Sequence, residues 1–235
     1  MTLDNIPQTS NELRNYFKRW PKFYYFIVDI FGPAYWGGLG PKDFLSKFPS
    51  SGKIINVGSG SRRIAEKVIN IDPMPFKEVD IVALGDALPF KDNEVAQVIC
   101  DTVLEHVESP AAVIGEISRV LEKGGYLYVT VPFLYPFHSS PHDFYRWTKE
   151  GVHQELNHFD IRMIGVRSGP FSAVTAYLCA LVGAIFSLGN ERLYWLLVNL
   201  STFLFFPIKY LDIIASHLPF SENMASIFYV VAQKK

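Results

Sequence analysis

Glycine and carboxylate residues in the first half of the chain form a pattern that suits a nucleotide-like cofactor. Gly58 and Gly60 frame a turn, and glycine lets a backbone approach a ligand where a side chain would clash. A carboxylate such as Asp72 can accept hydrogen bonds from the two hydroxyls of a ribose. Asp86 offers an acceptor for an exocyclic amine and is followed by apolar residues that can flank a purine. The predicted adenosine site comprises Gly58, Ser59, Gly60, Asp72, Asp86, Ala87 and Leu88.

A polar loop, residues 134–147, carries a second set of reactive side chains. A histidine can act as a base near neutral pH, and Arg146 is suited to clamp a carboxylate or phosphate. The alternative is that Arg146 holds the loop through Asp143 or a backbone carbonyl. Likewise, Glu105 and His106 would then only cap a helix and line the cofactor cleft. The candidate catalytic residues are His106, His138, Asp143 and Arg146.

The same loop has a spacing like that of metal ligands. His138, His142 and Asp143 lie close in sequence, but a loop pair without a third firm ligand is more often structural. Cys100 and Cys179 lie in apolar runs, which indicates a reducing cytoplasm rather than a zinc cluster or disulfide framework. We therefore expect no metal site.

Short apolar strands alternate with turns and helices around these residues, which is typical of a parallel α/β sheet. A helix is expected over 109–121, with Ser109 as its cap and Lys123-Gly124-Gly125 as its end. The interval between Gly60 and Asp72 leaves room for only a brief helix. The expected strands cover residues 53–57, 67–71, 79–83, 94–100, 126–131, 159–168 and 225–232.

The candidate cofactor residues all follow strands of this predicted sheet. Gly58 and Asp72 end the first two strands, and Asp86 and Asp101 follow the third and fourth. Ligands of open parallel sheets bind beyond the carboxyl ends of the strands. We therefore expect these residues to face one crevice.

Length and composition exclude several classes of protein. The 235 residues suit one α/β domain with an appendage. A net charge of −1 argues against binding of nucleic acid by phosphate neutralisation. Hydrophobic residues at 49% and charged residues at 19% exclude disorder. A mean hydropathy of +0.14 with 15% aromatic residues indicates more than an ordinary soluble core.

An almost uncharged segment follows the sheet. Between Ser168 and Ile208 only Glu191 and Arg192 are charged. The apolar runs 171–189 and 193–208 exceed a strand in length and predict two antiparallel helices. This hairpin would be inserted between the last two strands, beside the crevice. Three interpretations stay open: a membrane hairpin, a homodimer interface, or a wall around a lipid pocket.

Five motifs stand out along the chain, at residues 54–61, 70–72, 85–90, 103–107 and 116–125. Together they resemble the class I S-adenosylmethionine-dependent methyltransferases, in the branch often called type 11. The resemblance covers roughly residues 50–170 and implies a Rossmann-like, seven-stranded, mostly parallel sheet with helices on both faces. It further implies S-adenosylmethionine as cofactor, bound by Asn56, Ser59, Ala87, Leu88 and Asp101 together with the residues named next. Gly58 and Gly60 would pass the methionine end, Asp72 would hold the ribose, and Asp86 would meet the adenine amine.

Two positions depart from the family pattern. Asn56 stands where an acidic residue is usual, and Arg62 stands where a third glycine is usual. A subset of the family shares a similar histidine, aspartate and arginine string in the loop after the fifth strand, which adds interest to His138, Asp143 and Arg146.

These features predict methyl transfer to a small or lipid-linked acceptor in the cytoplasm, with oxygen as the first acceptor atom to test. One alternative is a non-catalytic S-adenosylmethionine-binding protein that acts through its apolar hairpin. An NAD-type oxidoreductase is disfavoured because Arg63 interrupts the Gly-x-Gly-x-x-Gly spacing. We expect an N-terminal lid or anchor at 1–52, a methyltransferase domain at 53–170 and 217–235, and a hydrophobic hairpin at 171–216.

Overall fold

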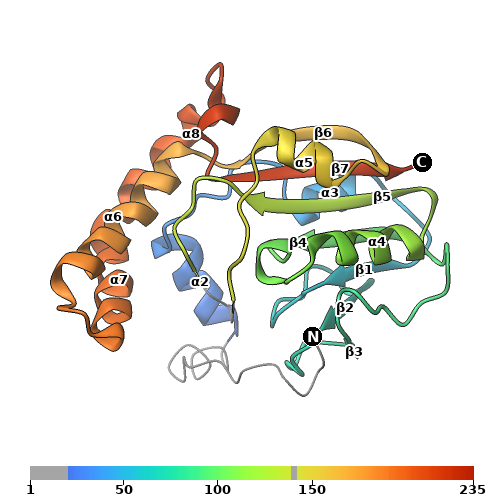
Figure 1. The fold of residues 1–235 in the computed structure, drawn as a ribbon, viewed down its shortest axis with the longest axis horizontal. Helices are drawn as coiled ribbons and strands as arrows, with labels where there is room; N and C mark the ends of the chain where they lie inside the picture. Colours follow the sequence, from blue (N-terminus) through green and yellow to red (C-terminus); the bar gives the residue numbers. More distant parts are fainter. Residues whose placement is uncertain (1–20, 139–141) are drawn as a thin grey trace.

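A seven-stranded sheet with the order β3-β2-β1-β4-β5-β7-β6 organises the molecule. The computed structural model describes residues 21–138 and 142–235. β7 runs antiparallel to β5 and β6, whereas the other neighbouring strands pair in parallel (Figure 1). The predicted mostly parallel sheet with a final antiparallel hairpin is confirmed. Its strands are β1 (Ile54–Val57), β2 (Val68–Asp72), β3 (Ile81–Val82), β4 (Val95–Asp101), β5 (Leu121–Pro132), β6 (Phe159–Ser168) and β7 (Ile227–Lys234).

Helix α4 (Pro110–Val120) begins as predicted, since the Ser109 hydroxyl accepts a hydrogen bond from a backbone amide of its first turn. The helix ends within one residue of the predicted Leu121, but Lys123-Gly124-Gly125, expected to close it, lies in β5. Leu121 is already extended and pairs with Val95 of β4. Strand β5 therefore begins directly after the helix, before the predicted strand start at residue 126.

The brief helix expected between Gly60 and Asp72 is wrong too. Residues 61–67, all within the described part of the chain, form turns rather than a helix. Arg63 holds this segment: its guanidinium contacts the carboxylates of Glu78 and Asp80 at 3.1 and 2.8 Å and donates to the Val68 carbonyl. The first crossover is thus fixed by a side chain instead of a helix.

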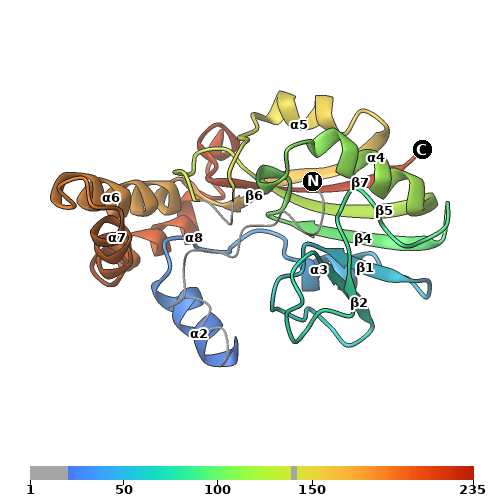
Figure 2. The same cartoon turned by 60° about the horizontal axis from the view of Figure 1, so that its bottom comes forward.

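Helices cover both faces of the sheet (Figure 2). α4 and α5 (Lys149–Glu155) lie on one face, and α3 (Pro41–Lys47) lies on the other. Under α3, Phe44 and Tyr128 are fully buried with ring centroids 5.5 Å apart. The Thr148 side chain caps α5, accepting from the amide of Gly151, as is usual at a helix start.

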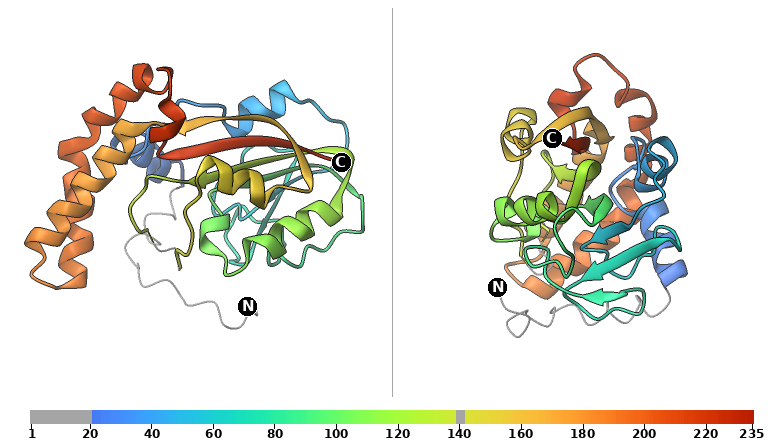
Figure 3. Two further views of the ribbon diagram at one scale, coloured as in Figure 1. Left: turned by 45° about the horizontal axis from the view of Figure 1, so that its top comes forward. Right: turned by 90° about the vertical axis from the view of Figure 1, so that its right-hand side faces the viewer.

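Two long helices project from the carboxyl end of the sheet (Figures 1 and 3). α6 (Pro170–Phe186) and α7 (Glu191–Phe205) run antiparallel and lie between β6 and β7 in sequence, which confirms the predicted inserted hairpin. They pack closely at Gly183, where a Cβ atom would lie 2.7 Å from Val198 and 2.9 Å from Tyr194. The chain returns to the sheet through η3 (Phe206–Leu211), α8 (Asp212–Ala215) and η4 (Ser221–Met224).

One buried carboxylate anchors the hairpin to this return segment. Asp212 is fully buried and accepts hydrogen bonds from the amides of Phe171 and Ser172 and from the Ser172 hydroxyl, at 2.9, 2.8 and 2.6 Å. The residue before α6, Gly169, offers no side-chain cap. Asp212 therefore caps α6 from a distant part of the chain, where its charge also suits the positive end of the helix.

Helix α2 (Pro21–Phe31) lies against the base of the hairpin. The ring of Phe31 lies 4.9 Å from the rings of both Phe203 and Phe206. The fully buried Lys209 donates from Nζ to the carbonyls of Asp29 and Gly32 at the end of α2. Part of the expected lid or anchor, residues 1–20, lies outside the described residues.

Candidate active site

The glycine turn follows β1 and closes on the end of β2. Gly58 and Gly60 have φ values of +69° and +57°, which glycine adopts without strain. A Cβ atom at Gly58 would lie 2.4 Å from Val103, whereas one at Gly60 would meet no atom of residues 21–138 and 142–235 within 4 Å. The turn is therefore packed on one side and leaves the Gly60 backbone open to a ligand.

Asp72 is buried directly beside this turn. Its Oδ2 accepts from the Gly60 amide and its Oδ1 from the Met74 amide, both at 2.8 Å. Each carboxylate oxygen has a second lone pair. A fixed carboxylate next to an open glycine backbone fits the ribose and methionine ends of S-adenosylmethionine, so the residues present suit this cofactor.

The other predicted cofactor residues lie at the same edge of the sheet. Asp86 and Ala87 are exposed, and Leu88 is buried with its amide donating to Glu116. Asp101 ends β4 and accepts from the Thr130 hydroxyl at 2.6 Å. Because β1, β2, β3 and β4 are parallel, their carboxyl ends lie at one edge of the sheet. Their individual roles toward the cofactor stay predictions.

The two departures from the family pattern have structural partners. Asn56 is buried and donates from Nδ2 to Asn70 Oδ1 at 3.2 Å, so an amide pair occupies the boundary between β1 and β2. Arg62 lies 3.7 Å from Asp29 of α2. Ser59 is buried and its amide donates to Ile71.

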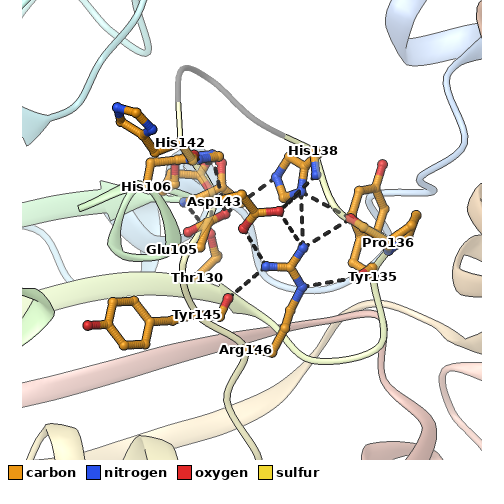
Figure 4. Close-up of polar contacts among 12 residues, drawn as sticks. Glu105, His106, Thr130, Tyr135, Pro136, His138, His142, Asp143, Tyr145 and Arg146 are labelled. Atoms are coloured by element: carbon orange, nitrogen blue, oxygen red, sulfur yellow. Dashed lines mark hydrogen bonds and ion pairs between the residues drawn. The ribbon is translucent and has the colours of Figure 1, made fainter. Parts of the chain in front are cut away.

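A second cluster lies where β4 gives way to the short helix η2 (Leu104–His106) (Figure 4). Glu105 is fully buried, and its Oε1 lies 3.9 Å from His106 Nε2 and 3.8 Å from His138 Nε2. Asp143 accepts from the His138 amide at 2.8 Å, and its Oδ2 lies 3.3 Å from His138 Nδ1. The structure thus brings together all four predicted catalytic residues, since Arg146 joins the cluster through Asp143.

Arg146 is occupied by its own loop. Its guanidinium makes a two-pronged ion pair with Asp143, at 2.5 and 2.7 Å. It further donates to the backbone carbonyls of Tyr135, Pro136 and Tyr145. These contacts favour the interpretation in which Arg146 holds the loop over one in which it clamps a substrate anion.

The two carboxylates of the cluster differ in their proton affinity. Burial raises the pKa of Glu105 to about 8. Burial also opposes ionisation of Asp143, but hydrogen bonds from Arg146 and from the His138 amide lower the pKa of Asp143 overall. Burial, with the nearby His106, lowers the pKa of His138 to about 4. At neutral pH His138 is therefore neutral beside an ionised Asp143–Arg146 pair.

Sequence reasoning assigned Glu105 only a lining role. Its neighbour His106 drew attention by residue type, whereas a single glutamate after a strand carries no comparable signal. The detail that sets it apart, complete burial between two histidines, depends on the loop folding back over η2. The Phe144 amide secures this fold by donating to the Glu105 carbonyl at 2.7 Å.

Comparison with known proteins identifies the central domain. Residues 55–129 match the family model described as "Methyltransferase domain". Uncharacterized protein MJ1123 of Methanocaldococcus jannaschii is 43% identical over 51 residues, which is 22% of this chain and 25% of that protein. An uncharacterized 37.1 kDa protein in transposon TN4556 of Streptomyces fradiae is 33% identical over 84 residues, 35% of this chain and 24% of that protein. The matched stretches thus span about a quarter of each curated relative.

Solved structures share the fold along almost the whole chain. An S-adenosylmethionine-dependent methyltransferase from Thermotoga maritima has a TM-score of 0.53 at 15% identity, covering 94% of this chain and 99% of its own. The [4+2]-cyclase SpnF has a TM-score of 0.52 at 17% identity, covering 97% of both chains. With the family match over β1 to β5 and a cofactor edge whose residues fit S-adenosylmethionine, this chain carries a methyltransferase domain of the class I S-adenosylmethionine-dependent fold.

Proposed function

We propose that this chain transfers a methyl group from S-adenosylmethionine to a small or lipid-linked acceptor, with oxygen as the first acceptor atom to test. The observation that carries the proposal is the exposed apolar hairpin at the same edge of the sheet as the cofactor residues. Gly58, Gly60, Asp72 and Asp86 would hold the cofactor, which supplies an activated methyl group when bound. The protein must then align the acceptor and take up its proton.

The hairpin exposes large apolar side chains along its length. Phe186, Leu188 and Leu204 are 60%, 90% and 71% exposed, and Ile214 in the return segment is 70% exposed. The helical stretch Glu191–Ala215 is long and apolar enough to cross a bilayer by length and composition. A surface of this kind with almost no charge favours contact with lipid over contact with water.

Helix α6 lies close enough to the loop after β5 to affect the pKa values of two residues there. Tyr135, in the loop after β5, is desolvated so that its pKa rises to about 12, with a smaller contribution from Cys179 of α6. The pKa of Arg146 is raised chiefly by its hydrogen bond to Asp143, and Tyr177 of α6 also contributes. An acceptor bound along α6 would therefore lie near the loop that carries His138 and Arg146.

Within the cluster, His106 and His138 turn their Nε2 atoms toward Glu105. An acceptor hydroxyl placed beside these two imidazoles can give up its proton to one of them as the methyl group arrives. Asp143 and Arg146 act as positioning residues, because they fix the loop and the His138 ring rather than face outward.

Calorimetric titration with S-adenosylmethionine, S-adenosylhomocysteine and NAD tests the cofactor assignment. We expect micromolar binding of the first two and none of NAD. Tritiated S-adenosylmethionine, incubated with the protein and a total lipid extract, then tests transfer by label in the organic phase. Binding without any transferred label, to lipids or to small molecules in the aqueous phase, would favour the non-catalytic alternative.

Co-sedimentation with phosphatidylcholine vesicles tests the membrane contact. Phe186→Glu and Leu204→Glu should each reduce vesicle binding by tenfold or more, since each places a charge in the apolar surface at a cost of about 2 kcal/mol. Val82→Glu is the matched control, because Val82 is 48% exposed on the far strand β3. Equal binding by all variants would contradict lipid contact. A dimer that only the hairpin variants dissociate would assign the surface to a second subunit.

A further inference from the structure

Three side chains from two separate segments point at one another beside the sheet edge (Figure 4). Glu105 and His106 come from η2, and His138 comes from the loop after β5. One ligand atom from each lies within 4.8 Å of the other two. The Nε2 atoms of His106 and His138 lie 3.9 and 3.8 Å from Glu105 Oε1, which is too long for hydrogen bonds.

Glu105 is the unusual member of this group. Its side chain is fully buried, and neither carboxylate oxygen has a hydrogen-bond partner among residues 21–138 and 142–235. A buried carboxylate without hydrogen bonds is costly, and such groups are normally paired or coordinate metals. The Nε2 atoms of His106 and His138 lie too far from Glu105 Oε1, at 3.9 and 3.8 Å, to supply these hydrogen bonds.

The surroundings of both histidines select Nε2 as the atom that faces Glu105. His106 Nδ1 lies 2.5 Å from the His142 carbonyl. His138 Nδ1 lies 3.3 Å from Asp143 Oδ2, and that carboxylate is itself held by Arg146. Metal-binding histidines typically donate their second ring N–H to a carbonyl or carboxylate, which fixes the tautomer and the ring orientation.

We propose that Glu105, His106 and His138 bind one divalent transition-metal ion, with Zn²⁺ as the first ion to test. Two imidazoles and a carboxylate are the ligand set of catalytic zinc sites and of non-haem iron sites, and they leave a position open for a further ligand. Ligand atoms about 2.1 Å from a tetrahedral ion are roughly 3.4 Å apart. The site therefore closes when the two histidine–glutamate separations of 3.8 and 3.9 Å, and a third separation of at most 4.8 Å, shorten to this value.

The sequence predicted no metal because the loop histidines lacked a third firm ligand. The structure supplies two ligands from a different segment, so Glu105 and His106 stand in place of Asp143 and His142 in the set. The ion would lie beside the carboxyl end of β4, where an acceptor oxygen could fill the open position. This last step rests on the proposed function. In that reaction the bound ion, rather than a histidine acting as base, would favour loss of the proton from the acceptor.

The test is a Zn²⁺ titration of the full-length protein after chelator treatment, without cofactor, read by competition with a chromophoric chelator. We expect one saturable site at micromolar affinity or tighter. Glu105→Gln and His138→Ala should weaken it by about 100-fold, because each removes a ligand. Co²⁺ should give a visible absorption band in the wild type that both variants lose.

His142→Ala is the matched control. It removes a histidine four positions from His138 yet keeps the backbone carbonyl that contacts His106. Zn²⁺ affinity within threefold of wild type is expected for this variant. Undiminished binding by Glu105→Gln and His138→Ala, or no saturable site in the wild type, would overturn the proposal. S-adenosylmethionine binding is measured on the same samples, so failure of the metal site and failure of the cofactor site are distinguished.

Discussion

Replacement of Asp72 by alanine separates the cofactor role of this carboxylate from its structural role. In the folded chain its two oxygens accept from the amides of Gly60 and Met74. On the proposed assignment, Asp72→Ala removes two charge-assisted bonds to the ribose, about 1.5 kcal/mol each at the low end of the usual range. The sum of about 3 kcal/mol corresponds to a Kd for S-adenosylmethionine that is roughly 100-fold weaker.

The same substitution should cost little stability. The amides of Gly60 and Met74 are half-buried, so water can replace part of the lost bonding. A loss of about 1 kcal/mol lowers the Tm by about 2–4 °C in a chain of this size. Asp72→Ala should therefore stay folded at room temperature while losing most of its cofactor affinity.

Calorimetry and thermal melting measure the two effects on one sample. Asp160→Ala is the control, because Asp160 lies at the start of β6, at the opposite edge of the sheet, and its side chain is 52% exposed. We expect that variant to bind like the wild type. A folded Asp72→Ala protein with a Kd within twofold of wild type would refute the ribose assignment and the reasoning from the carboxyl edge.

Three further predictions concern the hairpin and its attachment. Asp212→Ala should lower the free energy of unfolding by about 3 kcal/mol in urea denaturation, since it removes a helix cap and leaves the buried Ser172 hydroxyl without this acceptor; an unchanged midpoint would contradict the capping role. Burial lowers the pKa of Lys209 to about 8, below its value near 10.5 in an unfolded chain. The unfolded state then binds more protons between these values, so stability should rise with pH from about 8 to 10.5, and Lys209→Met should lose this rise. Gly183→Leu should force α6 and α7 apart at Tyr194 and lower the Tm, whereas Leu181→Ala on the exposed face should not.

The sheet and its cofactor edge could be predicted because their signals are local. A few residues suffice to recognise each strand and the polar or glycine residue at its end. Gly58 and Gly60 follow one such strand, and Asp72 and Asp101 mark the ends of two others. The rule that parallel strands end at one edge then brings them together without any knowledge of long-range contacts. The two helices of the hairpin could be predicted in the same way, from two long apolar runs in the sequence.

The rest depends on contacts between distant segments. The end of α4 is set by pairing of Leu121 with Val95, and Arg63 replaces the expected helix after the glycine turn. Glu105 gained its importance only once the loop carrying His138 folded over it. From the sequence alone, Lys209 would be assigned to the surface. Its burial depends on α2, whose Asp29 carbonyl accepts a hydrogen bond from Lys209 Nζ.

The points at which the hairpin leaves and rejoins the sheet are themselves neighbours. Ser168, the last residue of β6, pairs with Ile227, the first residue of β7, and the Ser226 amide donates to the Ser168 carbonyl at 2.8 Å. Topologically, the whole insertion is therefore a single oversized turn between adjacent strands. Loop-closure entropy grows only slowly with length, so evolution could lengthen, shorten or exchange this turn without altering the register of the sheet. Acceptor range could then diversify independently of cofactor binding.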